Sequence, residues 1–176
     1  MRSKLCILVM VLGLAGCVSG TDQDNLQRYS LIENISTYAL SSDLDVKVRL
    51  LTPLERGGLV IKTSDVALYV ATSHKWTSEL DEQLRLLTVN ELLRYQVPGS
   101  TSFDIQVRQL YGSVDGVVYI SFAATVSSGE RIFKRSYETS FKQFADGYDY
   151  LVVSLRKGYV DLVNRLAADL GYSASA

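Results

Sequence analysis

Apolar and polar residues alternate along three short segments in the first half of the chain. In residues 45–51, DVKVRLL, the apolar side chains are valine and leucine and the intervening ones are charged. A period of two is typical of a half-buried strand. Residues 59–63, LVIKT, follow a Gly-Gly pair, and residues 66–72, VALYVAT, follow the turn signal Thr-Ser-Asp. We therefore expect three strands before the first helix.

The same alternation returns over three longer segments in the second half of the chain. These are residues 103–112, 117–126 and 131–141, and they are separated by the turn signals Asp115-Gly116 and Ser128-Gly129. Strands that follow one another through tight turns pair as antiparallel neighbours. The pattern predicts a three-stranded meander with one solvated face.

A central helix is predicted between these two groups of strands. Thr77 or Ser78 is placed to cap it, acidic residues fill its first turn, and it is expected to end near Tyr95. Its leucines and valine lie on two nearly opposite faces rather than in one stripe. Such a helix is covered on two sides, first by its own sheet. The second cover is either another element of this chain or a neighbouring subunit.

The clearest helical pattern lies near the end of the chain. Apolar residues recur there with helical spacing at Tyr148, Leu151, Val152, Leu155, Tyr159, Leu162, Val163, Leu166 and Leu170. Asp146 and Asp149 resemble a capping arrangement at its start, and Gly171 is placed to end it. Gly158, in the middle, costs about 1 kcal/mol relative to alanine and marks a close approach to the sheet.

Together these segments predict an α+β fold. The expected architecture is a mixed or antiparallel sheet with N-terminal strands, a central helix, a three-stranded meander and a long C-terminal helix packed on the sheet. With 47% hydrophobic and 21% charged residues, the chain has the composition of a globular protein. We expect a single domain over residues 29–172 and a disordered tail over residues 173–176.

The first residues have the pattern of a secretory signal. Two basic residues precede an apolar run of about ten residues, which is too short to span a bilayer. The run ends in Leu14-Ala15-Gly16-Cys17, which resembles the lipobox of bacterial lipoproteins. The alternative is an ordinary secretory signal in which the cysteine stands by chance.

The lipobox resemblance implies a lipid anchor at Cys17. Its sulfur would receive a diacylglyceryl group, the bond before it would be cut, and the new amino terminus would be acylated, for example by palmitate. Residues 1–16 are then a signal peptide and the polar residues 17–28 a lipidated tether. The residue after the cysteine is Val18, whereas lipoproteins that are retained in the inner membrane have aspartate there. In this respect the chain resembles outer-membrane lipoproteins that face the periplasm.

The cysteine, histidine and charge counts limit the chemistry of the mature protein. Of 2 cysteines, Cys6 leaves with the signal and Cys17 carries lipid, so we expect no disulfide, thiol nucleophile or sulfur metal site. One histidine without ligand spacing or a serine elbow predicts no metal, no cofactor and no hydrolytic triad. A net charge of -1 without a basic block excludes nucleic acid as an expected partner. We expect a protein that is not an enzyme.

One segment combines residues that are typical of interfaces. Tyr69 lies in a strand, and His74 and Trp76 follow shortly before the central helix. Such side chains often act as anchors in contacts between proteins, so we predict a partner or subunit interface at these three residues. The alternative is structural, with Trp76 packing the strand against the helix as a hydrophobic residue before a cap.

The whole pattern resembles the PqiC or YmbA family, the auxiliary lipoproteins of MCE-type transporters. The resemblance is carried by PLERGGLVIKTSDVALYVATSHKWTSELDEQL at 53–84, by the hairpin FDIQVRQLYGSVDGVVYISFAATV and by DGYDYLVVSLRKGYVDLVNRLAADL. Relatives often have a proline ahead of the first leucine of the central helix, where this chain has Ser78-Glu79-Leu80.

The resemblance implies a subunit of an intermembrane lipid transport system. Its expected partners are an MCE-domain protein and an inner-membrane transporter component, and its expected assembly is a ring-like homo-oligomer. It would be lipid-anchored on the periplasmic face of the outer membrane and dock the periplasmic conduit there. Two alternatives are open at this point, a stand-alone periplasmic carrier of lipid or another small ligand, and an assembly lipoprotein associated with an outer-membrane barrel.

Overall fold

A computed structural model describes residues 26–32 and 44–173 of the chain. The elements, in chain order, are β1 (Gln27–Tyr29), β2 (Asp45–Leu50), the short 3-10 helix η2 (Leu54–Arg56), β3 (Gly58–Ser64), β4 (Ala67–Trp76), α1 (Leu80–Leu92), β5 (Thr101–Ser113), β6 (Val117–Ser128), β7 (Arg131–Lys142) and α2 (Tyr148–Asp169). The predicted α+β order of strands, central helix, meander and long last helix is confirmed. Cys17 and the predicted signal peptide lie outside the described residues.

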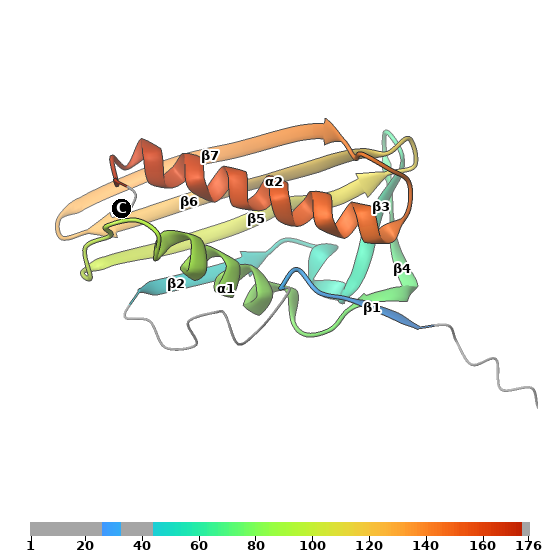
Figure 1. Cartoon of the computed structure of the whole chain (residues 1–176), viewed down its shortest axis with the longest axis horizontal. Helices are drawn as coiled ribbons and strands as arrows, with labels where there is room; N and C mark the ends of the chain where they lie inside the picture. Colours follow the sequence, from blue (N-terminus) through green and yellow to red (C-terminus); the bar gives the residue numbers. More distant parts are fainter. Residues whose placement is uncertain (1–25, 33–43, 174–176) are drawn as a thin grey trace, which may run out of the picture.

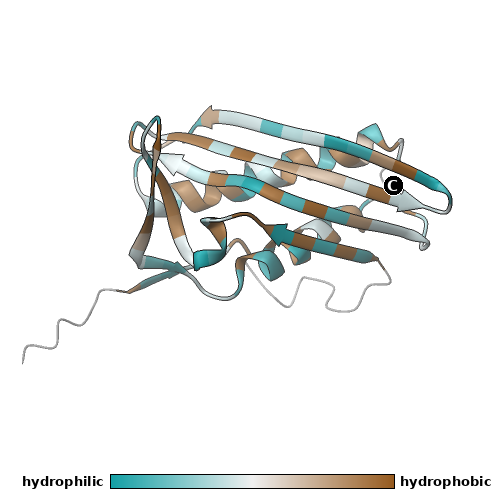
Figure 2. Ribbon diagram, turned by 180° about the vertical axis from the view of Figure 1, so that it is seen from behind, coloured by the Kyte–Doolittle hydropathy of each residue, from teal (hydrophilic) through white to brown (hydrophobic). Residues whose placement is uncertain are grey.

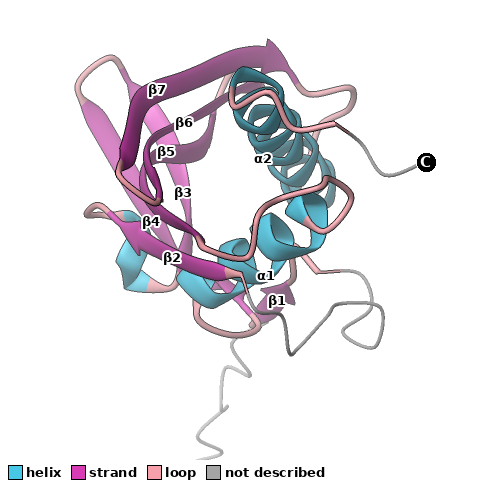
Figure 3. Ribbon diagram, turned by 90° about the vertical axis from the view of Figure 1, so that its left-hand side faces the viewer, coloured by secondary structure: helices cyan, strands magenta, loops and turns pink. Residues whose placement is uncertain are grey.

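The strands form one mixed, seven-stranded sheet with the order β1-β4-β3-β5-β6-β7. The long strand β5 has two parallel partners on one side. β2 pairs with its first half, from Asp45 opposite Ser102 to Leu50 opposite Val107, and β3 pairs with its end, where Ile61 is opposite Gly112. The sheet curls around the two helices, which close its open side (Figure 3).

The meander β5-β6-β7 is antiparallel, as predicted. Its side chains alternate between a buried face and a partly exposed one, so that Ile120 and Phe122 are inaccessible while Tyr119 and Ala123 are half-buried. Seen from behind, the same alternation gives bands of opposite hydropathy along the strands (Figure 2). The alternation in the sequence determines which face of the meander is buried. Shifting the register of a strand by one residue would expose its apolar side chains to solvent.

Helix α2 lies across the buried face of the meander (Figure 1). Gly158 makes the close approach that its position predicts. A Cβ atom there would overlap Ile120 Cδ1 and lie 2.8 Å from Phe141 Cε1. The helix ends at Asp169, and Gly171 shortly after it has a φ of 76°, the left-handed conformation expected of a glycine that follows a helix.

The predicted helix caps are wrong. The residues before α1 and α2 are Glu79 and Gly147, and neither makes a side-chain capping bond. At α1, Gln83 from inside the helix donates to the Ser78 carbonyl oxygen at 3.0 Å and ties the preceding chain to the helix. Gln83 also accepts a bond from the Leu31 amide at 2.8 Å and so ties the helix to the chain after β1. At α2, Asp149 remains only as a charge in the first turn.

Both covers of α1 come from this chain. The helix packs against β2 and η2 on one side and against α2 on the other, and it ends at Leu92, three residues before the predicted end. Thr88 contacts Tyr159 of α2 through their hydroxyl oxygens, 2.8 Å apart. Of the two alternatives for the second cover, the one within the chain is therefore confirmed. No helix in the described part of the chain is long and apolar enough to cross a membrane.

The sheet begins earlier than the alternation of residues indicates. Gln27 and Arg28, in the segment predicted as tether, form β1 with Tyr29 and pair in parallel with His74–Trp76 of β4. β4 itself continues to Trp76, four residues past its predicted end. A three-residue polar strand has no detectable period, so only its pairing with β4 and the burial of Tyr29 and Leu31 define it.

Candidate functional site

The three predicted interface residues all lie on β4 but in different surroundings. Tyr69 is 49% exposed, and Trp76 is only 5% exposed and belongs to the hydrophobic core. His74 is half-buried between them. Of the three, Tyr69 offers the most surface to a partner, while Trp76 packs in the core.

The first part of β4 has a free edge. Residues 67–73, ALYVATS, have β3 on one side, whereas β1 pairs only with residues 74–76 on the other. No other described strand pairs with β4. The segment carries no charged side chain, and Leu68 and Tyr69 on it are exposed. A strand edge of this kind is a template for pairing with another chain.

The opposite edge of the sheet, β7, has the reverse character. It is also an outermost strand among the described ones, but charged side chains are spread along its length at Arg131, Lys134, Arg135, Glu138 and Lys142. Charges on an edge strand oppose pairing with other strands. Of these two edges, the one at β7 is protected against association and the free part of β4 is not.

β4 has a large bulge between Val70 and Lys75, which overlaps the end of the free edge. Gly58 pairs with Lys75, and two residues later Val60 pairs with Val70, so four residues of β4 lie opposite one of β3. The bulge depends on Gly58, because a Cβ atom there would overlap the Ala71 carbonyl oxygen and lie 2.8 Å from Val70 Cγ1. β4 bends at this point, and its last residues turn toward β1 (Figure 1).

Beyond the bulge, three rings join β1, β4 and α2. The His74 ring stacks on Tyr148, the first residue of α2, with centroids 3.8 Å apart, and Tyr29 of β1 lies 5.9 Å from His74 on a nearly parallel plane. The Ser73 hydroxyl lies 3.0 Å from His74 Nδ1. Burial, and next the charge of Asp149, raise the pKa of Tyr29 above its ordinary value. The stack fixes the start of α2 beside β4.

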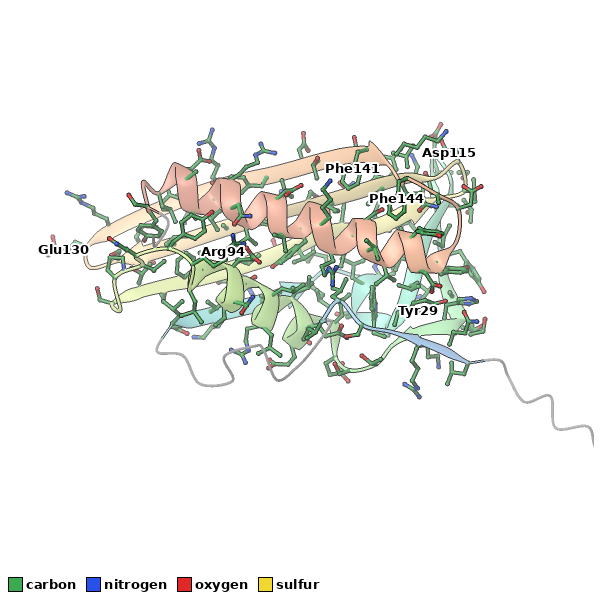
Figure 4. All side chains as sticks on the ribbon, viewed as in Figure 1. Tyr29, Arg94, Asp115, Glu130, Phe141 and Phe144 are labelled. Atoms are coloured by element: carbon green, nitrogen blue, oxygen red, sulfur yellow. The ribbon has the colours of Figure 1, made fainter. Side chains whose placement is uncertain are left out.

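Tyr29 and Tyr148 are the two members of this stack that the sequence alone does not identify. Tyr148 is visible only as the first position of the apolar stripe of α2, and Tyr29 carries no signal beyond being a tyrosine next to a polar segment. Tyr29 lies near His74 because β1 pairs with the end of β4, whereas Tyr148 stacks on His74 from the start of α2. Figure 4 shows Tyr29 at the end of the molecule where α2 begins.

A small pocket lies next to the stack. Its volume is about 210 Å³, and its walls are Ile61, Ser113, Val114, Gly116, Gln143, Asp146, Gly147, Tyr148 and Leu151. Sites for small molecules usually enclose about 300 to 1,000 Å³. The pocket beside the stack is smaller than that range. Within residues 26–32 and 44–173, histidine and carboxylate side chains form no group of three that could hold a metal ion.

Comparison with known proteins places this arrangement in a family. Residues 44–167, more than half of the chain, match the family described as the ABC-type transport auxiliary lipoprotein component. The match spans β2 to most of α2 and includes β4 with its free edge. The chain therefore belongs to this family, and the resemblance inferred from the sequence is confirmed.

Individual relatives agree with the family. The chain is similar to the intermembrane transport lipoprotein PqiC of Escherichia coli strain K12 and to that of Shigella flexneri, with 29% identity over 164 residues, 85% of this chain and 87% of each relative. A crystal structure of an uncharacterized protein, 26% identical, aligns with 82% of this chain and 97% of its own at a TM-score of 0.70. A Xanthomonas campestris protein, 12% identical, shares the fold at a TM-score of 0.60 over 70% of this chain and 79% of its own.

Proposed function

We propose that this member of the auxiliary lipoprotein family is the outer-membrane subunit of an MCE-type intermembrane lipid transport system, where it docks the periplasmic conduit. The observation that carries the proposal is the similarity to intermembrane transport lipoproteins along 85% of the chain. Because acyl chains do not cross water unaided, a transport system between two membranes needs a shielded path that is held at both ends. A lipid-anchored adaptor would hold the outer end.

The proposed anchor is Cys17, on the periplasmic face of the outer membrane. Each buried acyl methylene contributes about 0.8 kcal/mol, so a single chain binds only marginally and two or more hold a protein durably. A diacylglyceryl group with an additional amide-linked chain meets that requirement. The anchor would leave the folded domain at the membrane surface, in reach of an MCE-domain protein that extends from the inner-membrane component.

The proposed docking surface is the free edge of β4 with Tyr69 on it. A strand of a partner can pair with residues 67–73 through main-chain hydrogen bonds, and exposed side chains such as Leu68 and Tyr69 then select the partner. The partner is an MCE-domain protein or a second copy in a ring-like homo-oligomer. His74 and Trp76 would act indirectly, since they fix the end of β4 against α2 and the core.

The packing between α2 and the meander disfavours the alternative of a stand-alone carrier. Ile120, Phe122 and Tyr159 fill that space and are fully buried. A carrier would need an enclosed apolar cavity large enough for an acyl chain there. An adaptor needs no such cavity, and no cofactor or catalytic group. Co-purification distinguishes docking from the alternative of an assembly lipoprotein. An MCE-domain protein would support docking, and an outer-membrane barrel would support the alternative.

The anchor is tested by Cys17→Ala in the full chain. Without the thiol there is no acceptor for the diacylglyceryl group, so we expect an uncleaved precursor that is absent from the outer membrane. Mass spectrometry of the amino terminus and membrane fractionation measure both effects. A cleaved protein without acyl groups that still reaches the outer membrane would contradict the proposed anchor.

Docking is tested by placing a charge on the free edge. Leu68→Lys and Tyr69→Lys should each lower recovery of the MCE-domain protein, or of crosslinked oligomers, at least tenfold, because a lysine on an edge opposes strand pairing. Ser136→Lys on β7 is the matched control, since that edge is already charged. Circular dichroism confirms that the variants fold. If recovery falls equally in all three, or if the wild-type chain is a lone monomer under mild crosslinking, the proposed docking surface is wrong.

A further inference from the structure

Exposed apolar side chains gather at the end of the molecule where α2 begins. Val66, in the β3-β4 turn, is 97% exposed, Val114, in the β5-β6 turn, is 72% exposed, and Phe144, in the β7-α2 loop, is 71% exposed. Tyr150, in the first turn of α2, is also exposed, and its ring contacts that of Phe144 edge to face at 4.8 Å. We call these four residues the apolar end.

These residues come from four parts of the chain but lie together. The Val114 amide donates to the Lys62 carbonyl oxygen at 3.1 Å, which joins the β5-β6 turn to the β3-β4 hairpin. The Gln143 amide donates to the Gly116 carbonyl oxygen at 2.9 Å, which joins the loop of Phe144 to the same turn. Main-chain hydrogen bonds join these three loops, and each loop exposes an apolar side chain. Together they form an apolar surface, whereas a single exposed apolar residue would need no explanation.

The domain is joined to its proposed anchor from this same end. β1 runs parallel to the last residues of β4, and β4 runs away from the turn that carries Val66. β1 therefore begins on the side of the apolar end. Figure 1 shows β1 beginning at the end where the β3-β4 hairpin and the start of α2 lie.

The length of that chain is sufficient for the apolar end to touch the membrane. Cys17 precedes Leu26 by nine residues, which span at most about 30 Å when fully extended. Val66 precedes His74, the partner of Gln27, by eight residues of β4, which span at most about 26 Å because β4 bends between them. The anchor thus reaches at least as far as the apolar end projects beyond the start of β1.

The charges around the apolar end decide which kind of lipid it would meet. Asp65, Asp115, Asp146 and Asp149 outnumber Lys62 and Lys142 there, and Lys62 is already paired with Asp65 at 3.2 Å. Anionic lipids attract basic residues, so this surface gains nothing from them. Apolar insertion between neutral phospholipids, with the carboxylates at headgroup level, is the contact that fits both the charge and the exposed side chains.

We infer that the apolar end rests on the bilayer that holds the lipid anchor, with Val66, Val114 and Phe144 inserted at the membrane surface. This inference rests on the anchor of the proposed function and adds a second, non-covalent contact that sets the orientation of the domain. The free edge of β4 would then lie at a fixed distance from the membrane and in a fixed orientation relative to it.

The test uses the full lipidated chain in vesicles of phosphatidylcholine and phosphatidylethanolamine. Val66→Cys and Phe144→Cys are labelled with an environment-sensitive fluorophore, and Ile132→Cys is the matched control, since Ile132 is 66% exposed and lies next to the β6-β7 turn. Figure 4 shows Glu130 of that turn at the opposite end from Phe144 and Asp115. With Cys6 removed and Cys17 acylated, each introduced cysteine is the single free thiol.

We expect nitroxide-labelled phosphatidylcholine to quench the labels at 66 and 144 at least threefold more than the label at 132. Adding phosphatidylglycerol should not increase that difference. Protein that floats with the vesicles while all three labels remain equally open to an aqueous quencher would overturn the membrane contact alone. If the labels at 66 and 144 are shielded from both quenchers, a protein covers this end. That result would also overturn the membrane contact. Failure to float would overturn the anchor, and the contact with it.

Discussion

The layer formed by α2 and the meander differs from the β3-β4 hairpin in the use of its apolar side chains. In the first, β6 and β7 pair without a register shift over twelve residues, and the side chains between sheet and helix are fully buried. In the second, the register shifts twice in seven residues of β3, and Val66, Leu68 and Tyr69 are exposed. The sheet is continuous across both regions, but only the layer with α2 is a complete core.

This difference separates stability from binding. Burial of apolar surface is the main favourable term in folding, so the free energy of unfolding should depend mostly on the α2 layer. Near its turn the hairpin keeps Val66, Leu68 and Tyr69 exposed at little cost to the fold, as expected of a surface that meets a partner or a membrane. The same type of substitution should therefore lower the free energy of unfolding more in the α2 layer than in the hairpin.

The largest difference is expected between two leucine truncations. Leu162→Ala empties a site on α2 that is fully buried, and such changes lower the free energy of unfolding by about 2–5 kcal/mol. Leu68→Ala in the hairpin, where the side chain is 44% exposed, should lower it by less than about 1 kcal/mol. Urea denaturation of the two variants measures this. Equal losses of stability would contradict the distinction between the layer formed by α2 and the meander and the β3-β4 hairpin.

A smaller effect is expected where α2 approaches the sheet most closely. Gly158→Ala gains helix propensity of about 1 kcal/mol, but the added methyl group overlaps Ile120 Cδ1, and overpacking costs about 1–3 kcal/mol. We expect a net loss of stability.

Ile120→Val removes the overlapping atom and supplies the control. Alone it should cost about 0.5–1.5 kcal/mol, and combined with Gly158→Ala it should cost less than the sum of the two changes. Additive losses in this double-mutant cycle would mean that the tight contact at Gly158 is not the cause.

The smallest effect is expected at the hydrogen bond between the two helices. The Thr88 hydroxyl donates its proton to the Leu84 carbonyl oxygen at 2.8 Å, so Tyr159 is the donor to Thr88. Burial raises the pKa of Tyr159 above its ordinary value, which keeps the phenol protonated at neutral pH. Tyr159→Phe should cost about 1 kcal/mol, the net value of a typical hydrogen bond.

Thr88→Val should cost more than Tyr159→Phe, because it leaves the buried phenol donor without a partner, at about 1–3 kcal/mol. The double variant should be more stable than Thr88→Val alone, since both polar groups are then gone. Thermal and urea unfolding of the three variants give these differences. A double variant as unstable as the sum of the single changes would show that the two hydroxyls do not interact.

Most of the sheet and the last helix were predictable from periodicity. The strands from β2 to β7 coincide with alternating or apolar segments, and burial alternates most regularly in β2 and in the first half of β5. The cap residues were not predictable. Thr77, Ser78 and Asp146 have suitable side chains, but α1 starts where a tertiary contact holds it, the bond that the Leu31 amide donates to Gln83.

The candidate site was predictable only in part. Tyr69, His74 and Trp76 attract attention by residue type, yet their exposures differ because β4 bulges after Val70 and turns its last residues toward β1. Composition does not reveal a bulge that depends on the space around one glycine, Gly58. β1 itself, with three residues and no period, is defined by its partner strand.

The sequence by itself determined the class of fold, the direction in which each strand buries its side chains and the family to which the chain belongs. Those properties follow from local patterns, since the period of the apolar residues decides which face of an element is buried. Only the tertiary structure decided that β4 has an unprotected edge, that three turns bring Val66, Val114 and Phe144 together, and that His74 stacks on Tyr148. Such properties depend on contacts between residues far apart in the chain, and no local pattern encodes them.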